Sequence, residues 1–191
     1  MSFRLSLLRQ YWISGTDESE LATQDTTVHG KLSLKINNVE ISGCDDHDTD
    51  YGINQASVQL LKSIFIGREI NYEDPAIPHG CSIICTCPNC IIDFSVTHVA
   101  GQNVKLCDFY VSGGSSADAL RYNDLVCVVP LLDYASQVVV FAEQSLHFLP
   151  QEKHAEEYEV EAYLKVRGHH EKLLRRSEEH TSELKSRQSI S

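Results

Sequence analysis

A cluster of side chains capable of metal or redox chemistry lies near the middle of the chain. His79 is closely followed by four cysteines, Cys81, Cys85, Cys87 and Cys90. Thiolates and imidazole nitrogens are the common ligands of zinc, and two neighbouring thiols can also form a redox-active pair. Three interpretations are therefore open: a zinc site, a thiol oxidoreductase, or a group of buried apolar cysteines.

The zinc hypothesis depends on the spacing within Cys87-Pro-Asn-Cys90. Two intervening residues allow both thiolates to reach one ion. Cys85 can add a third ligand from the strand face that carries Cys87, and His79 or Cys81 can supply the fourth. Against this, zinc ribbons use two such pairs and the chain has one, and no glycine follows Cys90.

The oxidoreductase hypothesis needs a helix that the pattern does not predict. Cys-Pro-x-Cys resembles the dithiol of thioredoxin-like proteins, where a helix N-terminus activates the first thiol. Here Ile92, Phe94 and Val96 alternate with polar residues, which indicates a strand. Because unligated cysteine is among the most buried residue types, we favour apolar cysteines, with zinc as the alternative and an oxidoreductase third.

Other motifs are weaker. Asp46, Asp48 and Asp50 have the spacing of a calcium loop, but Tyr51 and Ser57 occupy the places of its glycine and glutamate. We expect a solvated loop there instead. His98 ends the predicted strand, and we expect it to be a hydrogen-bonded packing residue. No spacing of residues predicts a catalytic triad or a pair of catalytic carboxylates.

The periodicity predicts an α+β fold: a mostly antiparallel sheet packed with two or three helices in a single domain of residues 1–150. The expected strands are 28–36 with a hairpin return at 39–41, 82–86, 92–98, 104–111 and 125–129. Helices are expected at about 54–68, capped by Asp50 or Asn54, and from Pro130 in its first turn to about 148. Residues 151–176 form a charged segment of helical character.

The tail of residues 177–191 is expected to be disordered, since it has few apolar residues to bury. Residues 176–186 resemble a common DNA-sequencing adapter read in one frame, and only Lys185 departs from it, standing where the adapter gives Gln. We therefore interpret this tail as an artefact and exclude it from the fold prediction.

The charge of the chain limits its partners. Sixteen basic and 27 acidic side chains give a net charge of −11. Nucleic-acid binding needs clustered Lys and Arg, and anionic membrane surfaces attract basic segments, so neither partner is expected. No stretch approaches the ~20 apolar residues of a membrane span. We expect a cytoplasmic protein, in which cysteines are thiols or metal ligands more often than disulfides.

Parts of the chain resemble a group of small bacterial proteins without an assigned activity. The resemblance covers Tyr11-Trp12 and the run Cys87-Pro-Asn that leads to Asp93-Phe94-x-Val96-x-His98. Cys90 stands where that group has a glycine, which argues against Cys90 as a shared zinc ligand. The resemblance implies no catalytic role.

These observations favour a non-catalytic, cytoplasmic protein that binds a basic protein partner and needs no cofactor. Bacterial immunity and accessory proteins are of this kind, because acidic surfaces steer basic partners. The alternative is a zinc-binding protein that uses Cys85, Cys87 and Cys90 with His79 and Cys81.

Overall fold

The first of two antiparallel sheets is built from the N-terminal part of the chain. The computed structural model describes residues 2–11, 28–42, 50–80, 91–100, 102–112 and 119–148, together with 172, 175–176, 178–183 and 185–186. β1 (Phe3–Tyr11) pairs with β2 (His29–Ile36), which also pairs with the short strands β3 (Val39–Glu40) and β4 (Tyr51–Gly52). Alternation along β1 and β2 buries Phe3, Leu5 and Leu34, as expected for strands with one face in the core.

The second sheet is centred on β6 (Asn103–Val111). β5 (Ile92–Val99) pairs along one edge of β6, while β7 (Leu120–Tyr122) and β8 (Cys127–Pro130) pair with different parts of it. A bulge interrupts the β5–β6 pairing between Asp93 and Ser95, and Asp108 opposite it has a positive φ of 58°. Bulges of this kind redirect side chains on the sheet surface.

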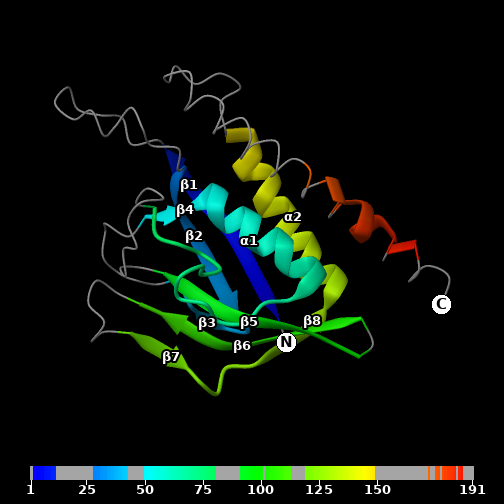
Figure 1. The fold of residues 1–191 in the computed structure, drawn as a ribbon, viewed down its shortest axis with the longest axis horizontal. Coiled ribbons are helices and arrows are strands. Elements are labelled where there is room, and N and C mark those ends of the chain that lie inside the picture. The colour runs from blue at the N-terminus through cyan, green and yellow to red at the C-terminus, as the bar shows by residue number, and fades with distance from the viewer. Residues whose placement is uncertain are drawn as a thin grey trace.

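Two helices complete the core. α1 (Ile53–Ile66) and α2 (Leu131–Phe148) lie side by side, and α1 crosses in front of the first sheet (Figure 1). α2 contacts β1 of the first sheet and β6 and β8 of the second. Buried residues of both sheets and both helices therefore form one hydrophobic cluster. The described helices include none long and apolar enough to cross a membrane.

Residues 76–80 connect the two sheets. Ile77 exchanges two backbone hydrogen bonds of 3.0 Å with Ile92 at the start of β5. Three residues later, the N–H of Gly80 donates to the carbonyl of Asp50 at 2.7 Å, beside β4. His79, between them, bridges to Tyr51. This segment thus joins the edge of each sheet immediately before the cysteine-rich residues 81–90.

The structure confirms the α+β class and the antiparallel pairing, and it corrects several details. α1 has Gly52 at its N-cap without a side-chain cap, because Asn54 instead accepts a hydrogen bond from the N–H of Val28. Pro130 is the last residue of β8, not part of α2. The strands β1 and β7 were not predicted.

The predicted strand at 82–86 and most of the charged segment at 151–176 lie outside the described residues. Residues 178–183 and 185–186 of the tail are helical, in contrast to the disorder that the composition predicted (Figure 1). Side chains in and beside the tail contact α1, and the composition of the tail could not predict these contacts. The ring of His180 lies 5.6 Å from that of Phe65 on α1, and Arg176 stacks 4.7 Å above the same ring.

Candidate functional site

Of the residues predicted for a zinc site, the structure describes His79 only. Cys81, Cys85, Cys87 and Cys90 lie outside the described residues, so the zinc hypothesis stays a prediction. The parts of the chain that are described contain no group of three or more potential metal-ligating side chains.

His79 lies close to two other polar side chains, His29 and Asp50. Burial lowers the pKa of His79 and outweighs the Asp50 carboxylate, which raises it; a charge on His29 lowers it further. The Oδ1 atom of Asp50 is buried and has no hydrogen-bond partner in the described structure. No sequence pattern groups these residues, since 50 positions separate His29 from His79.

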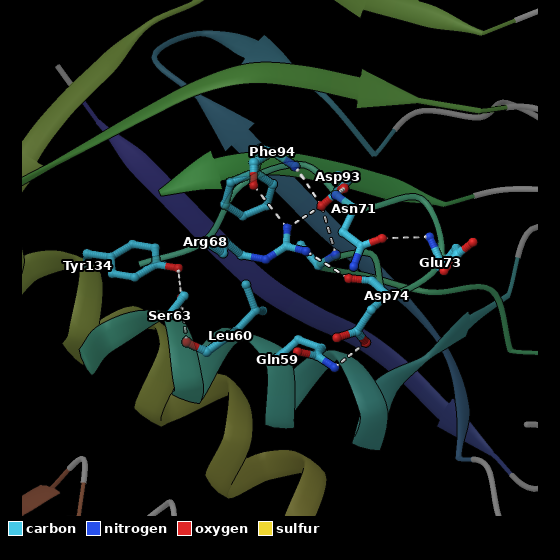
Figure 2. A network of polar contacts seen from close by, with 11 residues as sticks. Gln59, Leu60, Ser63, Arg68, Asn71, Glu73, Asp74, Asp93, Phe94 and Tyr134 are labelled. Carbon is cyan, nitrogen blue, oxygen red and sulfur yellow. Dashed lines mark hydrogen bonds and ion pairs between the residues drawn. The ribbon is translucent and has the colours of Figure 1, made fainter. Parts of the chain in front are cut away.

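A second polar cluster surrounds the buried carboxylate of Asp93 on β5 (Figure 2). Asp93 is fully buried and forms an ion pair with Arg68. Its Oδ1 also accepts the backbone N–H groups of Ala76 and Phe94, both at 3.0 Å, and its Oδ2 accepts that of Asn71 at 2.7 Å. The carboxylate is thus satisfied by one guanidinium and three amides, as a buried charge requires.

The Arg68 side chain extends this network to the backbone. Its Nη1 donates to the carbonyl of Phe94 and its Nη2 to the carbonyl of Asp74, both at 2.9 Å. Gln59 of α1 also donates to the Asp74 carboxylate. The planar guanidinium therefore holds β5 and the loop after α1 at once, which a lysine could not do with the same geometry.

The location of the network explains why a carboxylate is needed there. Arg68 pairs with Val96 and Ile77 pairs with Ile92, so the backbone follows the free edge of β5 at two points. Between those points the loop 69–76 leaves the sheet, and its N–H groups cannot pair with β5. Asp93 accepts two of them, which replaces the missing strand-to-strand hydrogen bonds.

This loop carries Tyr72 onto the solvent-facing side of the second sheet. Tyr72 is 50% exposed. Its ring meets that of Tyr110 edge-on with centroids 4.9 Å apart, and its hydroxyl accepts a 2.9 Å hydrogen bond from Arg121. The Arg121 guanidinium lies 5.0 Å from the centroid of Tyr110. We call these three residues the Tyr–Arg cluster.

The cluster belongs to a larger surface, the outer face of the second sheet. Residues paired across antiparallel strands point to the same face. Tyr110 pairs with both Asp93 and Arg121, and Lys105 pairs with both Thr97 and Val128. Val128, like Tyr72, is one of the exposed large apolar residues. The face thus combines aromatic, aliphatic and cationic side chains.

Acidic residues flank this face on the supporting loop. Glu69, Glu73 and Asp74 are all exposed, and they lie close to Tyr72 in sequence. Arg121 and Lys105 are the basic residues of the face itself. The rim is therefore acidic, in keeping with the charge of the whole chain.

Two further polar contacts lie where the helices pack against each other and against β5. The hydroxyls of Ser63 and Tyr134 lie 2.6 Å apart, but both are buried, and burial raises the pKa of Tyr134 to about 12. His98 lies with its Nε2 3.2 Å from the carbonyl of Ser63, which agrees with its predicted hydrogen-bonded packing role. Both arrangements stabilise the α1–α2–β5 packing.

Comparisons with known proteins do not assign the chain: no protein-family model, no curated protein and no solved structure matches it. The resemblance to small bacterial proteins therefore stays a prediction. The Tyr–Arg cluster and its buried support are the features on which a function can be argued.

Proposed function

We propose that the protein acts without catalysis, by binding a basic protein partner on the outer face of the second sheet. The observation that carries this proposal is the Tyr–Arg cluster, in which an exposed Tyr72 is held by Tyr110 and Arg121. Tyrosine and arginine are among the residues enriched at the energetic centres of protein interfaces.

The support beneath Tyr72 favours binding because it reduces the entropy lost on association. An exposed tyrosine on a free loop would have to be ordered by the partner, at a cost of about 0.5–1.5 kcal/mol for the side chain alone. Here Asn71, next to Tyr72, donates its N–H to the buried Asp93 carboxylate. The ring itself contacts Tyr110 and Arg121. The binding conformation is therefore already formed in the free protein.

Charge supports the choice of a basic partner. Glu69 and Glu73 add negative charge beside the cluster, and the chain carries −11 in total. A positively charged partner would be steered toward such a surface, and its association would slow as salt is added. A cytoplasmic location and an immunity-like or accessory role belong to the same proposal.

Selection from a phage-displayed library of random peptides tests the proposal even though the partner is unidentified. The target is the wild-type protein, and each selected peptide is then measured against three variants. Tyr72→Ala and Arg121→Ala alter the cluster. Val140→Ala removes another exposed apolar side chain, on α2, and is the matched control.

We expect selected peptides to be rich in Lys and Arg and to bind Tyr72→Ala and Arg121→Ala at least about tenfold more weakly, as loss of an interface centre requires. Val140→Ala should bind as the wild type does. Peptides that are neutral or acidic, or that bind all three variants equally well, would refute the proposal.

A further inference from the structure

The face of the first sheet that points away from the core carries a group of basic side chains. Arg4 on β1 is paired with Lys35 on β2, and both are exposed. Arg9 is paired with Lys31 in the same way, across the other end of the two strands. Residues paired across antiparallel strands point to the same face, and alternation along β2 places both pairs opposite the buried residues. We call these four residues the basic strip.

The basic strip contrasts with the charge of the whole chain. The chain carries −11 in total, yet β1, β2 and β3 together contain a single acidic residue, Glu40. Glu40 forms a 3.1 Å ion pair with Lys35 and also accepts a hydrogen bond from the hydroxyl of Ser33 at 3.0 Å. Four basic side chains and one acidic side chain leave three positive charges in excess on this face.

The arrangement of these charges is unfavourable for the sheet itself. Like charges directly opposite each other on neighbouring strands repel, and they destabilise the pairing. An acidic residue in place of Arg4 or Arg9 would convert each repulsion into an attraction, and it would suit the composition of this chain. Stability is commonly lost where a protein keeps residues for function, so the basic strip is a candidate binding surface.

Local structure gives the basic strip a defined shape. A bulge in β1 before Arg9 leaves Leu8 65% exposed beside it. The guanidinium of Arg9 lies 5.1 Å from the centroid of the Tyr11 ring, a cation–π contact that restricts its position. At a rise of about 3.3 Å per residue, the four positions from Lys31 to Lys35 separate the two charged pairs by about 13 Å.

The neighbouring edge of β1 is not open to an added strand. The N–H of Leu5 donates to the Oε1 atom of Gln137 on α2 at 3.4 Å. Further along, the side chain of Gln10 donates to the carbonyl of Gln144 at 3.2 Å. Because α2 lies along this edge, a partner that paired with β1 as an extra strand would have to displace it. A partner therefore lies across the face, on the side chains.

We propose that the basic strip binds an acidic segment of another protein, whose carboxylates pair with Arg4 and Arg9 and whose apolar side chains contact Leu8. A nucleic acid is less suitable, because its phosphates form a continuous line of charge that the rest of this acidic chain would repel. A short acidic segment places its charge on the basic strip alone. The basic strip and the Tyr–Arg cluster lie on different sheets, so this inference is independent of the proposed function.

Fluorescence anisotropy with three labelled probes tests the proposal. The first probe is a synthetic peptide with two glutamate-rich ends and a leucine between them, so that its extended form matches the spacing of the basic strip. The second is the same peptide with every glutamate replaced by glutamine. The third is an oligothymidylate with as many negative charges as the first. Each probe is titrated with the protein at low and at physiological salt.

Variants locate the binding surface. Arg4→Gln and Arg9→Gln are combined in one double variant. Arg175→Gln, which removes an exposed arginine outside the first sheet, is the matched control, and Arg4→Gln alone changes the net charge by the same amount. Urea unfolding of each variant shows whether the fold is retained, and sedimentation equilibrium gives the oligomeric state.

We expect the acidic peptide to bind the wild type and to bind less tightly as salt is added. The double variant should bind it about tenfold more weakly, while its stability should equal or exceed that of the wild type, because the like-charge pairs are relieved. Arg4→Gln alone should weaken binding several-fold, and Arg175→Gln should bind as the wild type does.

Failure of the wild type to bind the acidic peptide, equal binding of the glutamine peptide, or an equal loss in Arg4→Gln and Arg175→Gln would overturn the proposal. Tighter binding of the oligothymidylate would instead assign the basic strip to nucleic acid. Self-association of the wild type that the double variant lacks would assign it to a second copy of the chain. A destabilised double variant would show that the basic pairs serve the fold. The peptides selected for the outer face of the second sheet would be unaffected in every case.

Discussion

Replacing Asp93 by Asn should destabilise the protein strongly, although the two side chains have nearly the same shape. The change removes the charge that neutralises Arg68, whose side chain is only 10% exposed. It also turns one carboxylate oxygen into an NH2 group. That group would face backbone N–H donors, such as that of Asn71, which lies 2.7 Å from Oδ2 in the wild type.

The expected loss follows from these two effects. Leaving one member of a buried ion pair without its partner costs about 3–5 kcal/mol. Arg68 keeps two carbonyl acceptors, those of Phe94 and Asp74, so the lower end of that range applies. A donor facing a donor at the Asn71 amide adds about 1 kcal/mol. The total of about 4 kcal/mol is a large share of the roughly 5–15 kcal/mol that stabilises a typical domain.

Urea unfolding followed by circular dichroism measures this loss as a change in midpoint at constant slope. The control is Lys35→Met, which removes an ion pair with Glu40 whose side chains are 51% and 38% exposed. Exposed pairs contribute about 0–1 kcal/mol, so this variant should remain close to wild type.

A double variant, Asp93→Asn with Arg68→Met, tests the cause of the loss. Removing the unpaired guanidinium should restore part of the stability, so the two changes should be non-additive by about 1–3 kcal/mol. A loss below about 1 kcal/mol in Asp93→Asn, or additive effects in the double variant, would refute the view that the ion pair is the central element of the network.

Two further predictions concern α1 and its neighbours. Burial raises the pKa of Tyr134 to about 12. The protonated hydroxyl therefore contributes its full stabilisation below the pKa of about 10 that tyrosine has in the unfolded chain, and this contribution is lost as the pH rises from about 10 to about 12. The free energy of unfolding should fall by roughly 3 kcal/mol over this pH range. Tyr134→Phe should show no such decline, but it should be about 1 kcal/mol less stable at neutral pH because it lacks the Ser63 contact. Urea unfolding at several pH values measures both effects. An identical alkaline decline in both proteins would contradict this assignment. Gly67→Ala should cost about 1–3 kcal/mol in the same assay, because Gly67 has a φ of 65° and a Cβ there would clash with the carbonyl oxygen of Val96. Wild-type stability in Gly67→Ala would show that the turn adjusts freely.

The sequence predicts the regular elements well where apolar residues repeat with one clear period. Residues 92–98 alternate, and β5 follows them closely. β1 also alternates at first, with Phe3 and Leu5 buried and Arg4 exposed, but a bulge after Leu7 leaves Leu8 exposed, so its periodic signal is short. β7 has only three residues and two of them are exposed, so it has almost no periodic signal. Its position depends on the pairing partner β6.

The polar clusters could not have been predicted, because each depends on contacts between distant residues. Arg68 and Asp93 are 25 positions apart, and an acidic residue in an alternating strand predicts solvent exposure. Asp93 is fully buried because the loop 69–76 covers it and supplies its hydrogen bonds. The Tyr–Arg cluster likewise requires the loop, β6 and β7 to be in place before its residues can meet.

The buried carboxylate of Asp93, which departs from the strand pattern, contributes both to stability and to the surface of the proposed function. A hydrophobic residue at position 93 would suit burial, but it could not accept the N–H groups of Asn71 and Ala76, and the loop would lose its attachment to β5. The loop would then no longer hold Tyr72 against Tyr110. A buried ion pair is a weak source of stability compared with apolar packing, so its value here lies in fixing one conformation of the loop. Departures from local sequence rules are expected at functional sites. Asp93 is such a departure, and it lies beneath the loop that carries Tyr72 on the outer face of the second sheet.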